Sequence, residues 1–300
     1  MLSVVIIAWN EEKNLPRAIS SARRLADEIV VVVDTASTDK TLEIAKKLKC
    51  QVFTHAHTGI VEPMRNFSLS KARGDWVLLL DADEEITAEL SSRIQKLVSS
   101  NKADYFRISR KNIIFGKWIK SEHWWPDYVY RLFKKGAVTW DDAIHSIPFT
   151  RGTGADLPAE ENLSLIHHHY DSISQYVDRL NRYTDYQMTA VLEGGYNFNW
   201  TDLWHKPFAE FINQFFARRG YADGIHGLAL AGLQGFSELV LYLKLWQSSQ
   251  FVSGNVPPIS IDQEIANSKS QWRWWLYQSR IETSFWPFTW WWRLLRKLGL

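Results

Sequence analysis

A short apolar run that ends in acidic residues constrains this chain more than any other feature. Residues 76–80 are WVLLL and residues 81–85 are DADEE. Five apolar residues are too few for a helix and lack the alternation of a half-exposed strand, so they predict a strand buried on both faces of a parallel sheet. Asp81 and Asp83 would then lie at the carboxyl edge of that sheet, where open α/β sheets bind ligands. Two such oxygen ligands suit Mg²⁺ or Mn²⁺, although the same letters also occur in an acidic turn that leads into a helix.

Strand and helix patterns alternate along the first part of the chain. The pattern predicts strands over residues 2–8, 28–33 and 51–54, and helices that begin after Asn14 and cover residues 40–48 and 63–72. This alternation favours an α/β fold with a right-handed, mostly parallel sheet. Neither G-x-G-x-x-G after the first strand nor G-K-[ST] occurs, so a bound nucleotide must be held by side chains and metal.

The pattern changes after about residue 100 to adjacent short strands, which predict an antiparallel addition and therefore a mixed sheet. These strands are expected over residues 104–111, 113–119, 128–133, 137–140 and 163–170, and Gly116 and Gly136 are expected to mark turns. Ser172 then begins a capping box that opens a long helix. The apolar residues of this helix keep helical spacing and are expected in the core: Ile173, Tyr176, Val177, Leu180, Tyr183, Met188 and Val191.

Domain boundaries follow from these changes of pattern. We expect a catalytic domain over residues 1–195, a helical appendage over residues 196–250, and a linker with a tryptophan-rich tail over residues 251–300.

Composition and charge narrow the functional classes. A chain of 300 residues with 46% hydrophobic and 23% charged residues is globular, and its net charge of +2 gives no support for nucleic-acid binding. The single cysteine, Cys50, fits a reducing compartment. The start of the chain lacks the pattern of a secretory signal, and Glu238 interrupts the most apolar stretch, residues 224–243. We therefore expect a cytoplasmic protein that meets a membrane only peripherally.

The tail has the composition of a helix that lies in a membrane interface. Seven tryptophans fall between Trp272 and Trp292, and no acidic residue follows Glu282. Helical spacing after Pro287 separates an apolar face (Phe288, Trp291, Trp292, Leu295 and Leu298) from a polar one (Thr289, Arg293, Arg296 and Lys297). The alternative is a helix packed on the appendage or on a partner chain.

Three sequence blocks together carry a family resemblance. They are AWNEE at residues 8–12, VDTASTDKT at residues 33–41 and DAD at residues 81–83, each at the end of a predicted strand. In this order and spacing the chain resembles the family 2 glycosyltransferases. It departs from their pattern at Ala36, where the family often has glycine.

Further residues resemble one group within that family. Arg65 and Asn66 follow a loop with Gly59, residues 131–133 are RLF, and His145 comes later. These features are similar to bacterial lipopolysaccharide-core and cell-envelope β-glucosyltransferases. The resemblance covers about residues 1–250, and the tail lies outside it.

The resemblance implies a GT-A fold and an inverting transfer from a nucleoside-diphosphate sugar, expected to be a UDP-sugar, to a glycan or glycolipid acceptor such as a lipid-linked or lipopolysaccharide-type molecule. A divalent ion, Mn²⁺ or Mg²⁺, would stabilise the leaving diphosphate. The expected metal ligands are Asp81, Asp83 and His145. The nucleotide would be bound by Ala8, Trp9, Asn10, Glu11, Asp34, Arg65 and Asp81.

An inverting transfer needs a base for the acceptor hydroxyl, and Asp127 is our choice. It follows two tryptophans and a proline at the start of a predicted strand, and Asp141, Asp142 and Glu122 are alternatives. Residues 167–169 are three histidines, but on a strand the middle one faces away from its neighbours, so we expect a structural role for them.

Two other functions compete with an enzyme of this kind. A non-catalytic carbohydrate-binding or membrane scaffold protein could keep the fold, but Asp34, Asp81 and Asp83 argue against it. A nucleotidyltransferase would need a basic glycine-rich loop near the first strand, and the chain has none.

Overall fold

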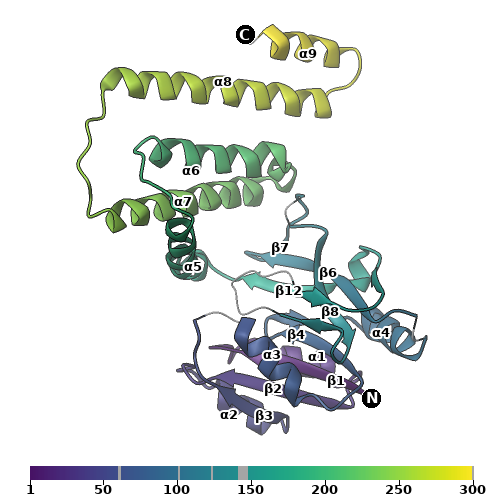
Figure 1. Ribbon diagram of the computed structural model, residues 1–300. Coiled ribbons are helices and arrows are strands. Elements are labelled where there is room, and N and C mark those ends of the chain that lie inside the picture. Colours follow the sequence, from purple (N-terminus) through teal and green to yellow (C-terminus); the bar gives the residue numbers. More distant parts are fainter. Residues whose placement is uncertain (60–61, 101, 123, 141–147, 299–300) are drawn as a thin grey trace. The chain divides into compact units, whose positions relative to one another are not determined.

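The computed structural model describes residues 1–59, 62–100, 102–122, 124–140 and 148–298 (Figure 1). Two compact units make up the chain. The first comprises Met1–Ile114 and Trp124–His169, and the second comprises Phe115–His123 and Tyr170–Leu300. The long helix after Ser172, which the sequence placed with the first 195 residues, thus belongs to the second unit.

A mixed, mostly parallel sheet forms the centre of the first unit, with strand order β3-β2-β1-β4-β8-β6-β12-β5. Strands β1, β2, β3 and β4 are parallel, whereas β8 runs antiparallel to both β4 and β6. The predicted sheet is therefore confirmed. Its strands are β1 (Leu2–Ala8), β2 (Glu28–Asp34), β3 (Gln51–His55), β4 (Trp76–Asp81), β5 (Glu84–Glu85), β6 (Tyr105–Ile114), β8 (Asp127–Lys134) and β12 (Leu165–Tyr170).

Helices cover both faces of the parallel strands. In β4, Leu78 belongs to one apolar cluster and Leu79 to another, and neither side chain is exposed. The first cluster includes residues of α1 (Leu15–Ala22) and α4 (Ala88–Ser100), and the second includes Met64 of α3 (Glu62–Lys71). Burial on both faces explains why β4 has an unbroken apolar sequence. Helix α2 (Thr41–Lys47) follows β2.

The short strands differ from expectation near residue 115. Strand β6 continues to Ile114, and a turn follows because Phe115 and Gly116 have φ angles of +50° and +78°. Two consecutive residues in the left-handed region are typical of a tight hairpin turn, which leaves only a short β7 (Lys117–Trp118) instead of a strand over residues 113–119. The remaining short elements are β9 (Val138–Thr139), β10 (Phe149–Thr150), β11 (Gly154–Asp156) and the 3₁₀ turn η1 (Glu161–Leu163).

The second unit is mainly helical. Ser172 caps α5 (Ile173–Glu193) as predicted, since its hydroxyl accepts a hydrogen bond from the Gln175 amide at 3.1 Å. The prediction of its core residues was too broad: Tyr176 and Leu180 are buried, but Ile173, Val177 and Tyr183 are exposed. The other elements are α6 (Asp202–Ile212), η2 (Asn213–Ala217), η3 (Gly220–Asp223), α7 (Ile225–Ser248), α8 (Pro258–Thr283) and α9 (Phe288–Leu298).

Helix α7 is long and apolar enough to cross a membrane, judged by length and composition alone, despite Glu238. A third of its most apolar window is buried inside the protein. Gly235 explains part of that burial, because a Cβ atom there would lie 2.8 Å from the Pro207 carbonyl oxygen of α6. Glycine thus lets α6 and α7 pack closely.

Candidate active site

The loops after β1 and β2 are tied to each other at the carboxyl edge of the sheet. Asn10 has a positive φ of 55°, and its side-chain oxygen accepts a hydrogen bond from the Thr38 amide at 2.8 Å. The Glu11 amide donates to the Thr41 hydroxyl at 2.7 Å. Asn10 and Glu11, both expected to bind nucleotide, therefore hold the two loops in register through a side chain and a backbone amide.

Asp34, Trp9 and His57 come together beside these loops. Asp34 is buried, and its two oxygens accept from the Ala36 amide and contact His57 Nδ1, each at 2.8 Å. The ring of His57 lies 5.1 Å from that of Trp9. Trp9 and Asp34 therefore both contact His57, a loop residue after β3 that had not been identified from the sequence. Their expected contacts with a nucleotide stay a prediction.

Asp81 ends β4 in a buried ionic network. Arg131 on β8 is 1% exposed and forms ion pairs with both Asp81 and Glu84. Glu84 also accepts a hydrogen bond from the Asp81 amide at 3.0 Å, which closes the acidic turn. Burial raises the pKa of Asp81, but the positive charges of Arg131 and Arg65 lower it by more than burial raises it. The pKa of Asp81 therefore lies well below its usual range.

Asp127 begins β8 and is held by residues of β6. Its Oδ2 atom accepts from Arg110 Nε at 2.8 Å and from Asn112 Nδ2 at 3.1 Å. Arg110 Nη1 lies 3.7 Å from Glu84, the same carboxylate that pairs with Arg131. The candidate base is therefore linked to Glu84 through Arg110, and from Glu84 to Asp81 through Arg131.

A second path joins Asp127 to Asp83. The Oδ1 atom of Asn112 lies 2.6 Å from His167 Nδ1, and His167 Nε2 lies 3.4 Å from Asp83 Oδ2. Asn112 donates its amide hydrogens to Asp127 and to the Trp124 carbonyl, so its oxygen must accept from His167. Nδ1 consequently carries a hydrogen, and Nε2 is the nitrogen directed at Asp83.

The residues present fit a divalent metal ion. A carboxylate oxygen of Asp83 and Nε2 of His167 converge, and a hydrogen bond from the other ring nitrogen orients the imidazole, as is usual for metal-binding histidines. Oxygen and imidazole donors suit Mn²⁺, and phosphate oxygens and water can complete its coordination. Over the ranges described above, no group of three or more His, Cys, Asp or Glu residues is arranged for a metal.

The other predicted residues are distributed as follows. Arg65 lies over the ring of Trp140 at 5.3 Å from its centroid. Ala8 is buried at the end of β1. His168 contacts Glu85 and points away from the stacked rings of His167 and His169, as the alternation on a strand predicted. Glu122 is part of the second unit, and three predicted residues lie outside the described part of the chain: His145, Asp141 and Asp142.

Sequence reasoning missed several residues of this site, namely Glu84, Arg110, Asn112 and Arg131, and it assigned His167 to structure. Each stands on a strand whose polar residues give no local signal of their partners. Several of their contacts join residues that are far apart in the sequence: Arg110 reaches Asp127 over 17 positions, and Asp83 reaches His167 over 84.

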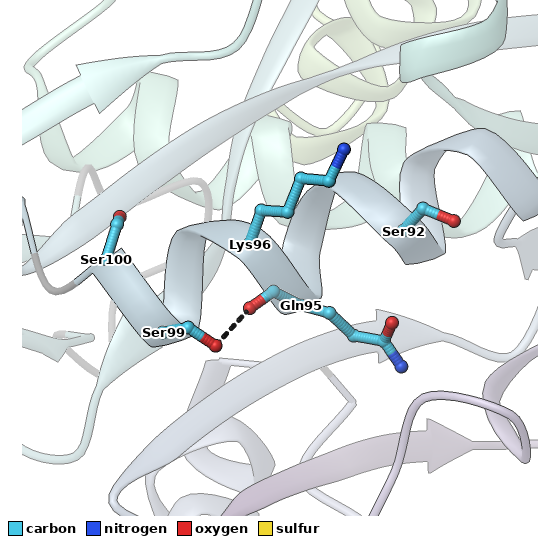
Figure 2. A pocket seen from close by; sticks show the side chains of 5 residues that line it. All are labelled: Ser92, Gln95, Lys96, Ser99 and Ser100. Carbon is cyan, nitrogen blue, oxygen red and sulfur yellow. Dashed lines mark hydrogen bonds between the residues drawn. The ribbon is translucent and has the colours of Figure 1, made fainter.

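None of these residues lines the hollow of about 660 Å³ whose lining side chains are labelled in Figure 2. Five exposed residues of a single helix, α4, surround it: Ser92, Gln95, Lys96, Ser99 and Ser100. The Ser99 hydroxyl donates to the Gln95 carbonyl of its own helix at 2.9 Å. The hollow is therefore the polar outer surface of α4, and we assign no site to it.

A mixed, mostly parallel sheet that is flanked by helices and whose parallel strands end in acidic loops is the architecture of GT-A glycosyltransferases. Residues 3–152 match the family described as Glycosyl transferase family 2. The chain belongs to this family, and its class of activity is glycosyl transfer.

Relatives extend beyond the matched segment. The chain is 31% identical over 257 residues to an uncharacterised glycosyltransferase of Rickettsia typhi, and this alignment covers 83% of this chain and 87% of that protein. It is 25% identical to the lipopolysaccharide core biosynthesis glycosyltransferase LpsC of Rhizobium meliloti, over 79% of this chain and 86% of that protein. Among solved structures, Staphylococcus aureus TarS 1–349 is similar with a TM-score of 0.45 and 16% identity, over 81% of this chain and 91% of that one.

Proposed function

We propose that this glycosyltransferase moves a sugar, with inversion and with the help of Mn²⁺ or Mg²⁺, from a nucleoside-diphosphate sugar to a glycan or glycolipid acceptor. The supporting observation is that contact paths join Asp127 to both Asp81 and Asp83. One path leads through Arg110, Glu84 and Arg131 to Asp81. The other leads through Asn112 and His167 to Asp83. A donor-side carboxylate and a candidate base are thus parts of one network.

The nucleotide of the donor is assigned to the loops after β1 and β2. The indole of Trp9 offers a flat surface for a base, and Asp34 offers a buried acceptor for its polar edge. His57 Nδ1 already lies 2.8 Å from one Asp34 oxygen. When a base binds Asp34, His57 would therefore have to move or donate a hydrogen bond to that base. Uridine is the base that we expect.

Asp127 is assigned the proton of the acceptor hydroxyl. Arg110 and Asn112 fix its Oδ2 atom, while the described residues offer no hydrogen bond to Oδ1. A base oriented through one oxygen can accept a proton on the other at the moment when the hydroxyl attacks. Arg110 would then stabilise the carboxylate in its oriented form rather than act on the substrate.

Asp83 and His167 are assigned to the metal ion, with Asp81 directed at the ribose or at a metal-bound water and His145 still a candidate ligand. When bound, such an ion stabilises the negative charge that develops on the leaving diphosphate. The role of Arg131 is to neutralise Asp81, so that two carboxylates can stand at one turn without mutual repulsion.

The acceptor class is inferred from a relative and from the tail. LpsC is named for lipopolysaccharide core biosynthesis, and a lipid-linked or lipopolysaccharide-type acceptor is therefore the expected substrate. An acceptor of this kind resides at a membrane. We place the enzyme at the cytoplasmic face of the plasma membrane, attached peripherally.

A panel of nucleotide sugars tests the donor assignment. The full chain is incubated with each sugar and Mn²⁺, and release of nucleoside diphosphate is measured. Asp83→Asn should abolish metal-dependent turnover with the fold intact, because the amide keeps the shape of the carboxylate and loses its charge.

Asp156→Asn is the matched control, since Asp156 pairs with Arg107 on the surface of the same unit. Undiminished turnover of Asp83→Asn at saturating donor would overturn the metal assignment. An absence of turnover with every nucleotide sugar, together with retained glycan binding, would favour the non-catalytic scaffold protein.

A further inference from the structure

Exposed apolar side chains are distributed very unevenly between the two units. The described residues include 25 large hydrophobic side chains that are exposed, and only Met1 and Phe149 of these belong to the first unit. The other 23 belong to the second unit. A concentration of this kind marks a surface that binds something apolar.

The end of the chain forms a helical hairpin, in which α8 and α9 lie side by side (Figure 1). One face of α9 is closed against α8. The ring of Trp292 stacks on Tyr277 at 5.8 Å, and the Arg280 guanidinium lies 4.3 Å from the Trp292 ring. Arg296 bonds to Gln278, so part of the face that the sequence assigned to lipid, and one of its basic residues, are used inside the hairpin.

The opposite face of the hairpin is left uncovered and is aromatic. At the turn between the helices, Phe285 is 85% and Trp286 is 75% exposed. The uncovered apolar residues of α9 itself recur at helical spacing, because positions 291, 294 and 298 fall on one side. We call the whole set the hairpin face: Phe285, Trp286, Phe288, Trp290, Trp291, Leu294 and Leu298.

Basic residues border the hairpin face without acidic ones. Arg293 and Lys297 are exposed and lie four residues apart on α9, beside the apolar stripe. No acidic residue follows Glu282 in the sequence. Such a surface complements anionic headgroups above an apolar layer, and long basic side chains can reach the headgroups while their stems lie along the apolar layer.

We propose that the hairpin face inserts shallowly into the interface of an anionic lipid bilayer. The helix α9 has 11 residues and is therefore about 16 Å long, too short for a hydrocarbon core of roughly 30 Å, so it lies in the interface. Tryptophan and phenylalanine at the turn enter the acyl boundary, whereas Arg293 and Lys297 bind lipid phosphates. The inference deepens the proposed membrane location, and it is independent of the donor and metal assignments.

Co-sedimentation of the full chain with vesicles tests this proposal. Vesicles of phosphatidylcholine alone are compared with vesicles that also contain phosphatidylglycerol, across a salt series. Trp286→Ala with Phe288→Ala should weaken binding by about tenfold or more at every salt concentration, because the lost term is apolar burial. Arg293→Gln with Lys297→Gln should weaken it by about fivefold per charge at low salt, only on the anionic vesicles.

The matched control is Phe149→Ala, which removes a phenylalanine that is 66% exposed in the first unit and should leave binding unchanged. Equal binding of the aromatic variant and the unmodified chain would overturn the proposal. The proposal would also be overturned if the unmodified chain self-associates without lipid, as measured by sedimentation, and the aromatic variant does not. The hairpin face would then bind a second copy of the chain. Donor hydrolysis, recorded in parallel, should be the same in all these variants, so a failure of the enzymatic assignment is visible separately.

Discussion

Arg131 should contribute far more to stability than another arginine of the same unit, and the reason is burial. Its side chain is 1% exposed, and it neutralises Asp81 and the fully buried Glu84. Arg131→Met keeps most of the side-chain volume but leaves both carboxylates without this cation. Breaking a buried pair from one side costs about 3–5 kcal/mol, because the remaining charge stays desolvated.

Arg107→Met is the matched control. Arg107 makes two hydrogen bonds of 2.7 Å to Asp156, but the two side chains are 39% and 41% exposed. Water screens this pair, and exposed pairs of this kind contribute about 0–1 kcal/mol. Arg107 binds one carboxylate through two nitrogens, whereas Nη2 of Arg131 is shared by two carboxylates, so the comparison sets a buried charge cluster against an exposed ion pair.

Urea denaturation of the full chain gives the free energy of unfolding for both variants. Native-state hydrogen exchange of the β4 and β8 amides then shows whether the loss is located at these strands. We expect Arg131→Met to lower the free energy of unfolding by several kcal/mol more than Arg107→Met. Equal losses in the two variants would refute the reasoning, because they would mean that Asp81 and Glu84 are solvated or neutralised by other groups.

Two further predictions concern catalysis and acid stability. Asp127→Asn should lower kcat by at least about a hundredfold with little change in donor affinity. The control Asp156→Asn should change neither quantity. Weak donor binding by Asp127→Asn with a normal kcat would instead place Asp127 at the donor. Burial raises the pKa of Glu28, but hydrogen bonds from Ser3 and Arg73 lower it from 4.5 to about 2, so its stabilising contribution is present above pH 4.5 and is lost as the pH falls towards 2. Water screens the exposed Arg73, so Glu28→Gln should lower the free energy of unfolding by about 2–3 kcal/mol at neutral pH, less than the full pKa shift implies. Urea titrations between pH 4.5 and 2 should show a progressively smaller loss. A loss that does not change with pH would contradict this.

Local patterns predicted the elements that are stabilised by local physics. The β4 strand was predicted because burial on both faces requires an unbroken apolar run, and Leu78 and Leu79 do point into different clusters. The start of α5 was predicted because its cap is made within four residues, between Ser172 and Gln175. The turn at Gly116 was predicted from the glycine, but the part that Phe115 takes in it was not, since a phenylalanine with positive φ has no sequence signature of its own.

Helix faces were predicted less well than helix positions. Spacing identifies an apolar stripe but not its partner, so Ile173 and Trp292 were both assigned to the wrong environment. Ile173 was expected in the core and is 51% exposed. Trp292 was expected at a lipid surface and stacks on Tyr277. In both helices the neighbouring helix decides which of several apolar residues are covered.

The sequence by itself determined that acidic side chains stand at the carboxyl ends of buried strands, because this follows from residue order and the period of a strand. Only the tertiary structure decided which groups surround them. Strand β8 lies antiparallel to β4, which brings Arg131 to Asp81 across 50 positions. Strand β12 pairs with β5 and sets His167 opposite Glu84 in the ladder, within reach of Asp83. Sheet pairing is non-local, and its partners are chosen by the packing of the whole unit, so no stretch of sequence carries the network that joins Asp83 to Asp127.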